Sequence, residues 1–456
     1  MDVSYGLGFY GDPRRAESGY FLHKAMVEAP GCCVRALGKS RAGEIRFTRF
    51  LNSKHVNVEA MATHAASQTG RLAAGHDVLA IQDSSAIVLG GKKERVAGFG
   101  PVGKGGQLGG LCLHAVLAVN ARTGGLFGLV DVIVQNRTGG RKVTPHRSRP
   151  LCERESQRWL DGAQAASRVL AEAARITLVA DRESDIYEGY VQCPANVHLL
   201  TRVARDRKIV GGKGQLTSLY AFGDSLPACK TIKAIIPAAP GRKKRKARLE
   251  VRYASVEVRR PRYIKTADAP ARLALRLVDV REVAPPAGVE PIHWRLLTTH
   301  EVNTPKDALR MLAFYRRRWL IEEYFKVLKS GGMDIENARI GKPTTMINLT
   351  GAASIAAVTI MKLKQARDGL TDEGLESVFE AEDEPLFQAL SEELEGHTQK
   401  QKNQHPIGSL AWAQWVIARL GGWQCYYGKP GPKTYQRGLT KFHDIKRGAK
   451  LANRLV

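Results

Sequence analysis

The segment YRRRWLIEEYFKVLKSG, residues 315–331, combines a tyrosine with arginines, glutamates and lysines, and its pattern predicts one uninterrupted helix. An ideal helix advances about 100° per residue, so Tyr315, Arg318, Glu322 and Lys329 fall within about 60° of one another. These four side chains share one face, while most apolar residues lie on the other sides. The ordinary interpretation is a solvated face with ion pairs one turn apart, so the rest of the chain must decide whether this face has a function.

The composition of the whole chain narrows the class of partner. Its 456 residues are enough for two or three domains with a sizeable core. It carries 70 Lys plus Arg against 44 Asp plus Glu, a formal net charge of +26. This excess favours a polyanionic partner, with nucleic acid as the first candidate and a membrane surface as the competitor. The most apolar stretch, residues 349–363, is too short to span a bilayer and predicts a core helix, so we expect no membrane.

The cysteines do not indicate a structural metal or a disulfide framework. The chain has seven of them, widely spread, without a CxxC pair or a Cys/His set at zinc spacing. Any catalytic metal must therefore be held mainly by carboxylates, which favours Mg²⁺ or Mn²⁺.

The pattern of the chain changes along its length. The first seventy residues are basic and mainly helical in pattern, and strand-like runs rich in Val, Ile and Leu begin at residue 77, which predicts an α/β fold with a mixed sheet. Alternating strands at about 192–300 predict a β-rich insertion, in which GRKKRKAR (241–248) is expected to be a loop that approaches phosphates. Helices resume at Thr304, an expected N-cap, followed by Pro305. We expect three domains, at residues 1–70, 71–366 and 367–456.

Three carboxylates that are far apart in the chain are candidates for a metal site. Asp83 ends the apolar run in LAIQDSS, and Asp181 ends the run in TLVADRESD. In an open α/β sheet, catalytic groups gather outside the carboxyl ends of strands, where both aspartates are expected. Glu322 arrives from the helix at 315–331. Together they can hold two divalent ions, one of which activates a water or a 3′-hydroxyl while the other stabilises the leaving oxygen.

Other carboxylates compete for these roles. Glu183 and Asp185 follow Asp181 closely, and Glu323 is next to Glu322. On an ideal helix Glu323 points about 100° away from Glu322, which disfavours it. Taken singly, an aspartate after a strand is more often a cap or turn residue, so the combination of three carries the interpretation.

The spacing Tyr315-x2-Arg318-x3-Glu322-x6-Lys329 resembles the YREK signature of the IS-four family of bacterial DDE transposases. GDPRR, LAIQDSS, VADRESDIY, IHWRLLTT and GSLAWAQWVIARLGG are similar to other family segments in the same order, so the resemblance covers nearly the whole chain. It implies an RNase-H-like core with a mixed sheet, interrupted by the β-rich insertion and flanked by helical N- and C-terminal domains. In that core, two Mg²⁺ or Mn²⁺ ions would be bound by Asp83, Asp181 and Glu322.

The resemblance also implies DNA contacts. Arg318 and Lys329 would clamp phosphates beside the scissile bond, and Tyr315 would donate its hydroxyl to a phosphate or stack. Trp294 would stack on a flipped base while a DNA hairpin closes, although a tryptophan in an alternating strand is ordinarily a core residue. The remaining matches to DNA-binding positions are Arg202, Arg14 and Arg15.

A member of this family would be a cut-and-paste transposase, acting on terminal inverted repeats by strand cleavage, hairpin formation and strand transfer. Its partners would be double-stranded DNA and a second copy of itself, with residues 408–423 supplying the dimer contact. Its location would be the bacterial cytoplasm, on the nucleoid when bound to DNA. Two alternatives stay open: a structure-specific nuclease without strand transfer, and a catalytically inactive or inhibitory DNA-binding relative.

The sequence also departs from the family pattern. Only ten residues precede GDPRR, which is fewer than the resemblance implies and predicts weakened end recognition. Gln82 stands where an acidic residue is familiar, beside an intact Asp83. His114, in the strand-like run LCLHAV, is a candidate to face the metal site, but a buried and hydrogen-bonded histidine is the expected state.

Overall fold

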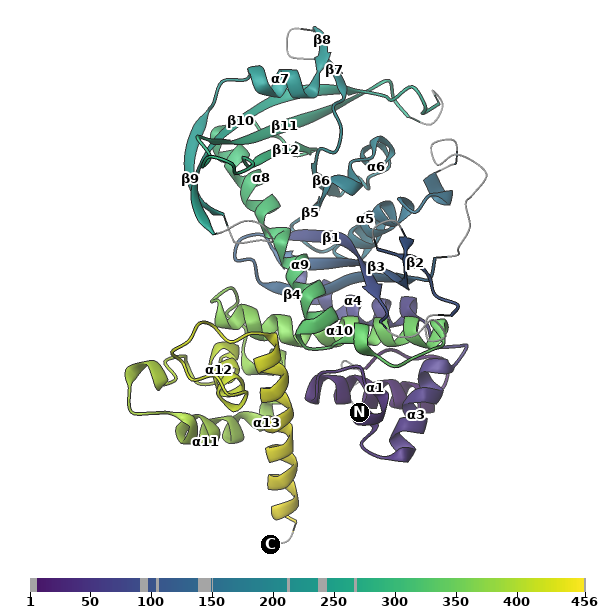
Figure 1. The fold of residues 1–456 in the computed structure, drawn as a ribbon, viewed down its shortest axis with the longest axis vertical. Coiled ribbons are helices and arrows are strands. Elements are labelled where there is room, and N and C mark those ends of the chain that lie inside the picture. The colour runs from purple at the N-terminus through teal and green to yellow at the C-terminus, as the bar shows by residue number, and fades with distance from the viewer. Residues whose placement is uncertain are drawn as a thin grey trace. The chain divides into compact units, whose positions relative to one another are not determined.

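The computed structural model describes residues 6–90, 97–103, 106–137, 149, 151–210, 214–236, 244–265 and 269–454. The protein is a mixed α/β molecule, whose helices and strands are labelled in Figure 1. Its chain divides into two compact units. Unit 1 comprises Met1–Ala74, Ser84–Gly140 and Leu320–Val456, and unit 2 comprises Gly75–Asp83 and Arg141–Trp319. These two compact units do not coincide with the three domains expected from the sequence, and the three domains stay a prediction.

Unit 1 contains a small sheet centred on strand β3 (Leu108–Asn120), which is buried along most of its length. The second half of β1 (Asp77–Val88) lies beside β3, and both β2 (Gly100–Val102) and β4 (Leu126–Gln135) pair with β3 in antiparallel orientation. Helices α4 (Val58–Ala73) and α10 (Pro343–Arg367) pack on β4.

Helix α10 organises the helical part of unit 1. By length and composition it is the one helix of the described residues that is apolar enough to cross a membrane, yet 78% of its most apolar window is buried inside the protein. The core helix expected at 349–363 is therefore confirmed. The other helices of unit 1 are α1 (Pro13–Glu28), α2 (Val34–Gly38), α3 (Arg41–Asn52), α9 (Trp319–Lys326), α11 (Glu384–Leu394), α12 (Leu410–Leu420) and α13 (Pro432–Ala452).

Helix α12, at the centre of the segment 408–423, is mostly buried within unit 1. Nine of its 11 residues are buried, because α10, α11 and α13 surround it. Its tryptophans, Trp412 and Trp415, pack inside unit 1. The packing of α12 is thus accounted for within unit 1, and the dimer contact expected of residues 408–423 stays a prediction, as does the homodimer.

Unit 2 is built on a mixed sheet in which a parallel part continues into an antiparallel part. The first half of β1, β5 (Arg175–Ala180) and β6 (Val197–Arg202) are parallel neighbours in that order. Strand β12 (His293–Thr298) then pairs antiparallel with β6. The β-rich insertion is thus an extension of the same sheet, because its last strand is hydrogen-bonded to β6.

The antiparallel part of unit 2 continues from β12 to β11 (Arg272–Val283) and β10 (Arg245–Arg259). Strand β10 also pairs with two shorter strands, β9 (Lys230–Ile236) and β7 (Lys208–Val210). Strand β7 pairs in turn with β8 (Leu216–Ser218). Arg242 and Lys243 of the expected basic loop lie outside the described residues.

The helices of unit 2 are α5 (Gln157–Val169), α6 (Tyr187–Val191), α7 (Leu219–Ser225) and α8 (Pro305–Arg317). Helix α8 begins as the sequence predicts: Thr304 is the N-cap, Pro305 is the first helical residue, and the Thr304 and Asp307 side chains form a capping box. It packs along β10 and β11 (Figure 1).

The stretch 315–331 is helical but not uninterrupted. Helix α8 ends at Arg317, Arg318 is its C-cap with helical backbone angles, and α9 follows from Trp319 to Lys326. From Val327 to Gly331 the backbone widens into a π-helical turn that contains Lys329. A constant step of about 100° per residue therefore does not apply to Lys329, so the uninterrupted helix was a wrong prediction and the direction of Lys329 does not follow from it.

Candidate active site

Three of the predicted residues form a row across the parallel strands of unit 2. The register of β1 and β5 sets Ile81 beside Val179, and the register of β5 and β6 sets Ala180 beside Thr201. Extended by one or two residues, these registers set Asp83 beside Asp181 and Asp181 beside Arg202. Side chains in register point to the same face of a sheet, so two carboxylates and a guanidinium share one face.

Asp83 is not at the carboxyl end of its own strand, which corrects the expectation from the sequence. Strand β1 continues to Val88, because its second half lies beside β3 after its first half has paired with β5. The parallel neighbour β5 does end at Ala180, so Asp181 follows a strand end as predicted. Asp83 thus reaches the site at the end of β5 rather than at the end of β1.

Arg318 binds directly to the first aspartate of the row. Its Nη1 donates to Asp83 Oδ2 over 2.6 Å, and the two side chains are only 13% and 11% exposed. The resemblance predicted a phosphate ligand at Arg318, and this ion pair adds a carboxylate partner. Since α8 carries Arg318 at its C-cap, the end of that helix is fixed against β1 within unit 2.

Tyr315 joins the same face from α8. Burial raises the pKa of its hydroxyl and Asp181 adds to the rise, whereas Arg318 and Arg202 oppose it. The phenol is therefore a neutral hydrogen-bond donor at ordinary pH. Burial lowers the pKa of the Arg202 guanidinium, which is hydrogen-bonded to Tyr315 and repelled by Arg182 and Arg318.

Trp294 lies next to Tyr315. Their ring centroids are 6.0 Å apart with the planes inclined at 60°, an edge contact. Strand β12 sets Leu296 beside Arg202, so Trp294, two residues earlier, points to the same face as Arg202. Six predicted residues thus come together in unit 2: Asp83, Asp181, Arg202, Trp294, Tyr315 and Arg318.

The structure separates Asp181 from its local competitors. Asp185 is buried and accepts hydrogen bonds from the Arg207 guanidinium at 2.6 Å and from the backbone N–H of Ala204 at 2.8 Å. Glu183 is paired with Arg158 at 3.1 Å. Asp181 Oδ1 accepts from the backbone N–H of Glu183, and within the described part of the chain its other oxygen makes no hydrogen bond. Asp181 is therefore the carboxylate of this loop best placed to accept a ligand.

Glu322 and Lys329 belong to unit 1. Glu322 lies in the first turn of α9, four residues after Arg318, and its distance from the two aspartates stays a prediction. Its neighbour Glu323 is bound by Lys364 at 2.9 Å, which agrees with the argument against it as a competitor. Lys329 lies 3.9 Å from Glu336, whose carboxylate also accepts from the backbone N–H of Val88.

The two N-terminal arginines differ in their surroundings. Arg14 is exposed at the start of α1, whereas the Arg15 guanidinium donates to the Tyr10 carbonyl over 2.6 Å and holds the chain that precedes the helix. Both DNA contacts stay predictions.

The fold adds a basic face that the sequence argument missed. Helix α2 is joined to α3 by a tight turn in which Lys39 has a left-handed backbone with φ of 55°. The exposed residues of α3 follow helical spacing along one stripe, and they are Arg41, Ala42, Ile45, Thr48, Arg49 and Asn52. Two helices joined by a tight turn are a recurrent shape for entering the DNA major groove, and of the two arginines on this stripe Arg41 is paired with Glu44 at 2.9 Å. The spacing i, i+1, i+4, i+7, i+8 was the signal available in the sequence.

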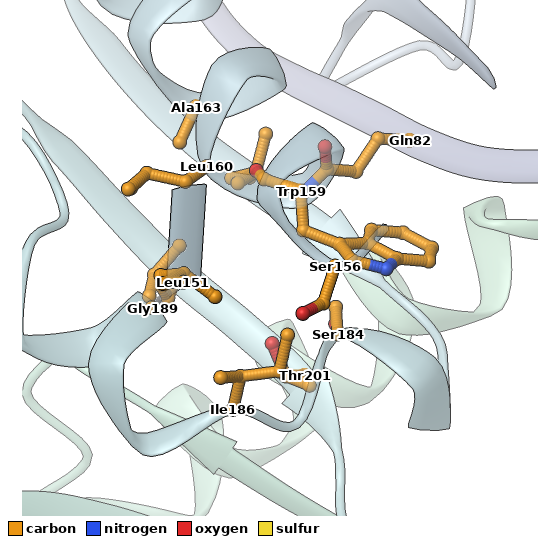
Figure 2. A pocket seen from close by; sticks show the side chains of 12 residues that line it. Gln82, Leu151, Ser156, Trp159, Leu160, Ala163, Ser184, Ile186, Gly189 and Thr201 are labelled. Atoms are coloured by element: carbon orange, nitrogen blue, oxygen red, sulfur yellow. The ribbon is translucent and has the colours of Figure 1, made fainter. Parts of the chain in front are cut away.

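Gln82 faces away from these carboxylates, and His114 is a core residue of unit 1. Gln82 donates to the Trp159 carbonyl over 3.3 Å and lines a pocket with Ser156, Ser184 and Thr201 (Figure 2). Because successive residues of a strand alternate, this pocket lies on the opposite face from Asp83. His114 is buried and hydrogen-bonded to Ser84 Oγ through Nδ1 at 2.9 Å, as expected for a satisfied core histidine.

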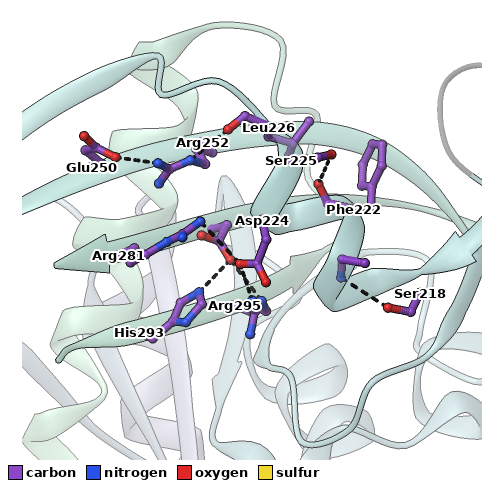
Figure 3. A network of polar contacts seen from close by, with 12 residues as sticks. Ser218, Phe222, Asp224, Ser225, Leu226, Glu250, Arg252, Arg281, His293 and Arg295 are labelled. Carbon is purple, nitrogen blue, oxygen red and sulfur yellow. Dashed lines mark hydrogen bonds and ion pairs between the residues drawn. The ribbon is translucent and has the colours of Figure 1, made fainter. Parts of the chain in front are cut away.

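A second acidic cluster lies in the insertion. The ligand atoms of Asp224, Asp279 and His293 are within 4.8 Å of one another, which is a geometry that could hold a cation. However, Arg295 contacts Asp224 at 2.6 Å and Asp279 at 3.1 Å, and Arg281 contacts Asp224 at 3.3 Å (Figure 3). Two guanidinium groups already neutralise the carboxylates, so we interpret this cluster as an ion-pair network.

The row of Asp83 and Asp181 suits a hard divalent ion by the type of its donors. Both are carboxylates, and the side chains around them are arginines and a tyrosine rather than thiols or imidazoles. Adjacent positive groups can bind phosphate oxygens of a polyanionic substrate, and the tyrosine can donate to them. No protein-family model matches the sequence.

Proposed function

We propose that this protein is a metal-dependent DNA transposase of the IS-four type, which cleaves transposon ends, forms DNA hairpins and joins the ends to target DNA. The observation that carries the proposal is the register row of Asp83 and Asp181, with Arg318 bound to the first and Tyr315 beside the second. Carboxylates and phosphate-binding groups are brought together from segments that are distant in the chain.

The strand order supports an RNase-H-like core. Strand β4 lies beside β3, the second half of β1 lies beside β3, and the first half of β1 is followed by the parallel strands β5 and β6. Three neighbouring strands followed by two parallel strands make up the sheet of such a core, and the order found here agrees with that arrangement. The insertion between β6 and α8 agrees with the interruption that the resemblance implies.

In the proposed mechanism, Asp83, Asp181 and Glu322 would hold two Mg²⁺ or Mn²⁺ ions, which would supply Lewis acidity for attack at phosphorus. Arg202 and Arg318 bind phosphate oxygens next to the row, and Tyr315 donates its hydroxyl to a phosphate. Trp294 presents a ring on which an unpaired base can stack. Lys329, Arg14 and Arg15 are proposed as further phosphate contacts, and two copies of the protein bring two DNA ends together.

The experiment that tests this proposal uses the full-length protein, a duplex that carries the inverted repeats flanking its gene, Mg²⁺ and a plasmid target. We expect nicked, hairpin and joined products in that order. Asp83→Asn, Asp181→Asn and Glu322→Gln variants should each lose all three products while still shifting the duplex in a gel. Full activity of these variants would overturn the proposal.

The same experiment separates the alternatives. Cleavage without joining of pre-cut ends would identify a structure-specific nuclease. DNA binding without any cleavage in Mg²⁺ or Mn²⁺ would identify a catalytically inactive or inhibitory relative.

A further inference from the structure

Asp279 is a fully buried carboxylate whose bonds are made to the strand that carries Trp294. It is 0% exposed and lies on β11. Its Oδ2 lies 2.9 Å from His293 Nε2 and 3.1 Å from Arg295 Nε. His293 and Arg295 are the two residues that flank Trp294 on β12, so a single carboxylate oxygen contacts both neighbours of the tryptophan.

The alternation of the strand explains why this arrangement acts on Trp294. Strand β11 pairs with β12 so that Asp279 is opposite Arg295 and Val280 is opposite Trp294. His293 and Arg295 therefore point to one face, toward Asp279, while Trp294 points to the other face, toward Tyr315. Fixing the two flanking side chains on the far face fixes the twist of the strand at Trp294 and hence the direction of its ring.

Helix α7 closes the far face. Gly223 lies so near that a Cβ at its position would be 3.3 Å from Asp279 Oδ2, and the next residue, Asp224, accepts from Arg295. The Arg295 guanidinium also lies over the Tyr220 ring, 4.2 Å from its centroid. Figure 3 shows Asp224, His293 and Arg295 pointing toward one another beneath this helix. The ion pair between Asp279 and Arg295 is therefore shielded from water, which strengthens it.

Strand β12 is also held on the face of the candidate active site. Arg202 Nη2 donates to the backbone carbonyl of His293 over 3.1 Å. The backbone just before Trp294 is thus held by Arg202, and its flanking side chains are held by Asp279.

We propose that Asp279, acting through His293 and Arg295, is a positioning residue that sets the ring of Trp294 at the candidate active site. All residues that position the ring belong to unit 2. Its consequence for DNA hairpin formation rests on the proposed function.

The positioning is tested by ¹⁹F NMR on protein labelled with 5-fluorotryptophan. The chain has six tryptophans, and the Trp294 resonance is assigned as the one lost in Trp294→Phe. Asp279→Asn is expected to shift or broaden this resonance while the other five stay in place, which also reports that the protein is folded. Glu257→Gln is the matched control, because it removes one carboxylate from an exposed ion pair with Arg272 in the same insertion.

A second pair of variants keeps the test decisive if Asp279→Asn does not fold. His293 is 28% exposed at its side chain, so its replacement leaves Asp279 paired with Arg295. His293→Ala should move the Trp294 resonance, and His293→Gln, which keeps a donor for Asp279, should restore it toward the wild-type position. A Trp294 resonance that moves no more in these variants than in Glu257→Gln would overturn the positioning role.

The consequence for DNA is read on the inverted-repeat duplex in Mg²⁺. Asp279→Asn and His293→Ala should keep first-strand nicking and lower hairpin yield on the order of tenfold, like Trp294→Ala, because a base–aromatic stack is weakened. If Trp294→Ala itself leaves hairpin yield unchanged while the NMR shifts occur, the stacking function fails and the positioning stands. Equal loss of nicking and hairpin formation in Asp279→Asn would show a general structural role and overturn the inference.

Discussion

At the scale of single residues, the candidate site depends on one ion pair between distant segments. Arg318 and Asp83 are 235 positions apart, and both side chains are nearly buried where they meet. A charge in such a place is tolerated because its partner helps to neutralise it, and removal of either partner takes that neutralising charge away from the other. The pair thus couples the stability of unit 2 to the residues proposed for catalysis.

Replacement of Arg318 by Ala should therefore lower the free energy of unfolding by about 3 kcal/mol. The double variant Arg318→Ala/Asp83→Ala should recover part of this loss, because the nearly buried carboxylate that lost its Arg318 partner is gone as well. Urea unfolding measures both effects. Arg272→Ala, which breaks the exposed pair with Glu257, should cost less than about 1 kcal/mol, and an equal cost for both arginines would contradict the argument.

His300 is a second residue whose charge is controlled by the fold. Its ring is stacked on His198 at 4.0 Å between centroids, and its Nε2 lies 2.8 Å from Thr177 Oγ1. Burial lowers the pKa of His300 to about 3, and His198, Arg310 and Arg175 add to this effect by electrostatic repulsion of its protonated form. The folded protein therefore keeps this ring neutral where the unfolded chain would bind a proton.

The sign of the resulting pH dependence follows from linkage. Above the unfolded pKa of about 6.5 both states are neutral, and below it the unfolded state gains a proton that the folded state refuses, so stability falls as pH falls. For His300 the loss between pH 7 and pH 5 should be about 2 kcal/mol. Urea unfolding at the two pH values should show a smaller loss for His300→Gln than for wild type. Parallel profiles would mean that His300 is not the titrating group.

At the scale of elements, helix α3 carries one arginine with a structural role and another that is available to a partner. The Arg46 guanidinium lies 3.1 Å from Glu17 and 4.4 Å from the centroid of the Phe21 ring, so it packs α3 against α1. Arg49 is exposed on the outer stripe of the same helix, and no ion pair or hydrogen bond of its side chain occurs among the described residues. The two positions differ in surroundings although their residue type is the same.

Arg49→Ala should consequently weaken binding to the inverted-repeat duplex and reduce the slope of log affinity against log salt by about 0.9, as expected for the loss of one phosphate contact. Fluorescence anisotropy at several salt concentrations measures this slope. Arg46→Ala should instead lower the melting temperature and leave the slope unchanged. If Arg46→Ala changes the slope as much as Arg49→Ala, α3 does not face the DNA through its outer stripe.

At the scale of the whole molecule, the net charge of +26 is the feature that most directly restricts the class of partner. Buried arginines are neutralised by carboxylates, as in the pairs Arg207–Asp185 and Arg154–Glu188. The excess positive charge is therefore carried mainly by exposed arginines and lysines. Binding through such a surface releases counterions from a polyanion and is therefore sensitive to salt.

Affinity for a duplex of unrelated sequence should fall by a factor of about 10³ between 50 and 200 mM salt if about six phosphates are contacted. Vesicles that contain anionic lipid should bind more weakly than this duplex at about 200 mM salt. Fluorescence anisotropy and vesicle sedimentation are the two measurements. Tighter binding to vesicles than to this duplex, together with a weak salt dependence on DNA, would favour the membrane-surface interpretation of the charge.

Much of the fold could be predicted from local pattern. The start of the α/β pattern at residue 77, the β-rich insertion at about 192–300, the cap of α8 at Thr304 and the core helix α10 all lie where periodicity and turn residues predict them. The exceptions are places where tertiary context changes a local rule: β1 runs on past Asp83 because a second neighbour pairs with it, and the helix after Arg318 widens at Val327.

The sequence by itself determined which residue types were available for chemistry: Asp83 and Asp181 at the ends of apolar runs, Glu322 with its spacing to Tyr315 and Arg318, and a strong excess of positive charge. Only the tertiary structure decided that Asp83, Asp181 and Arg202 share one register row, that Asp185 and Glu183 are used by arginines, and that Asp279 supports the strand of Trp294. The physical reason is that strand register and the partner of a buried charge are set by contacts between segments many residues apart, which no local periodicity encodes.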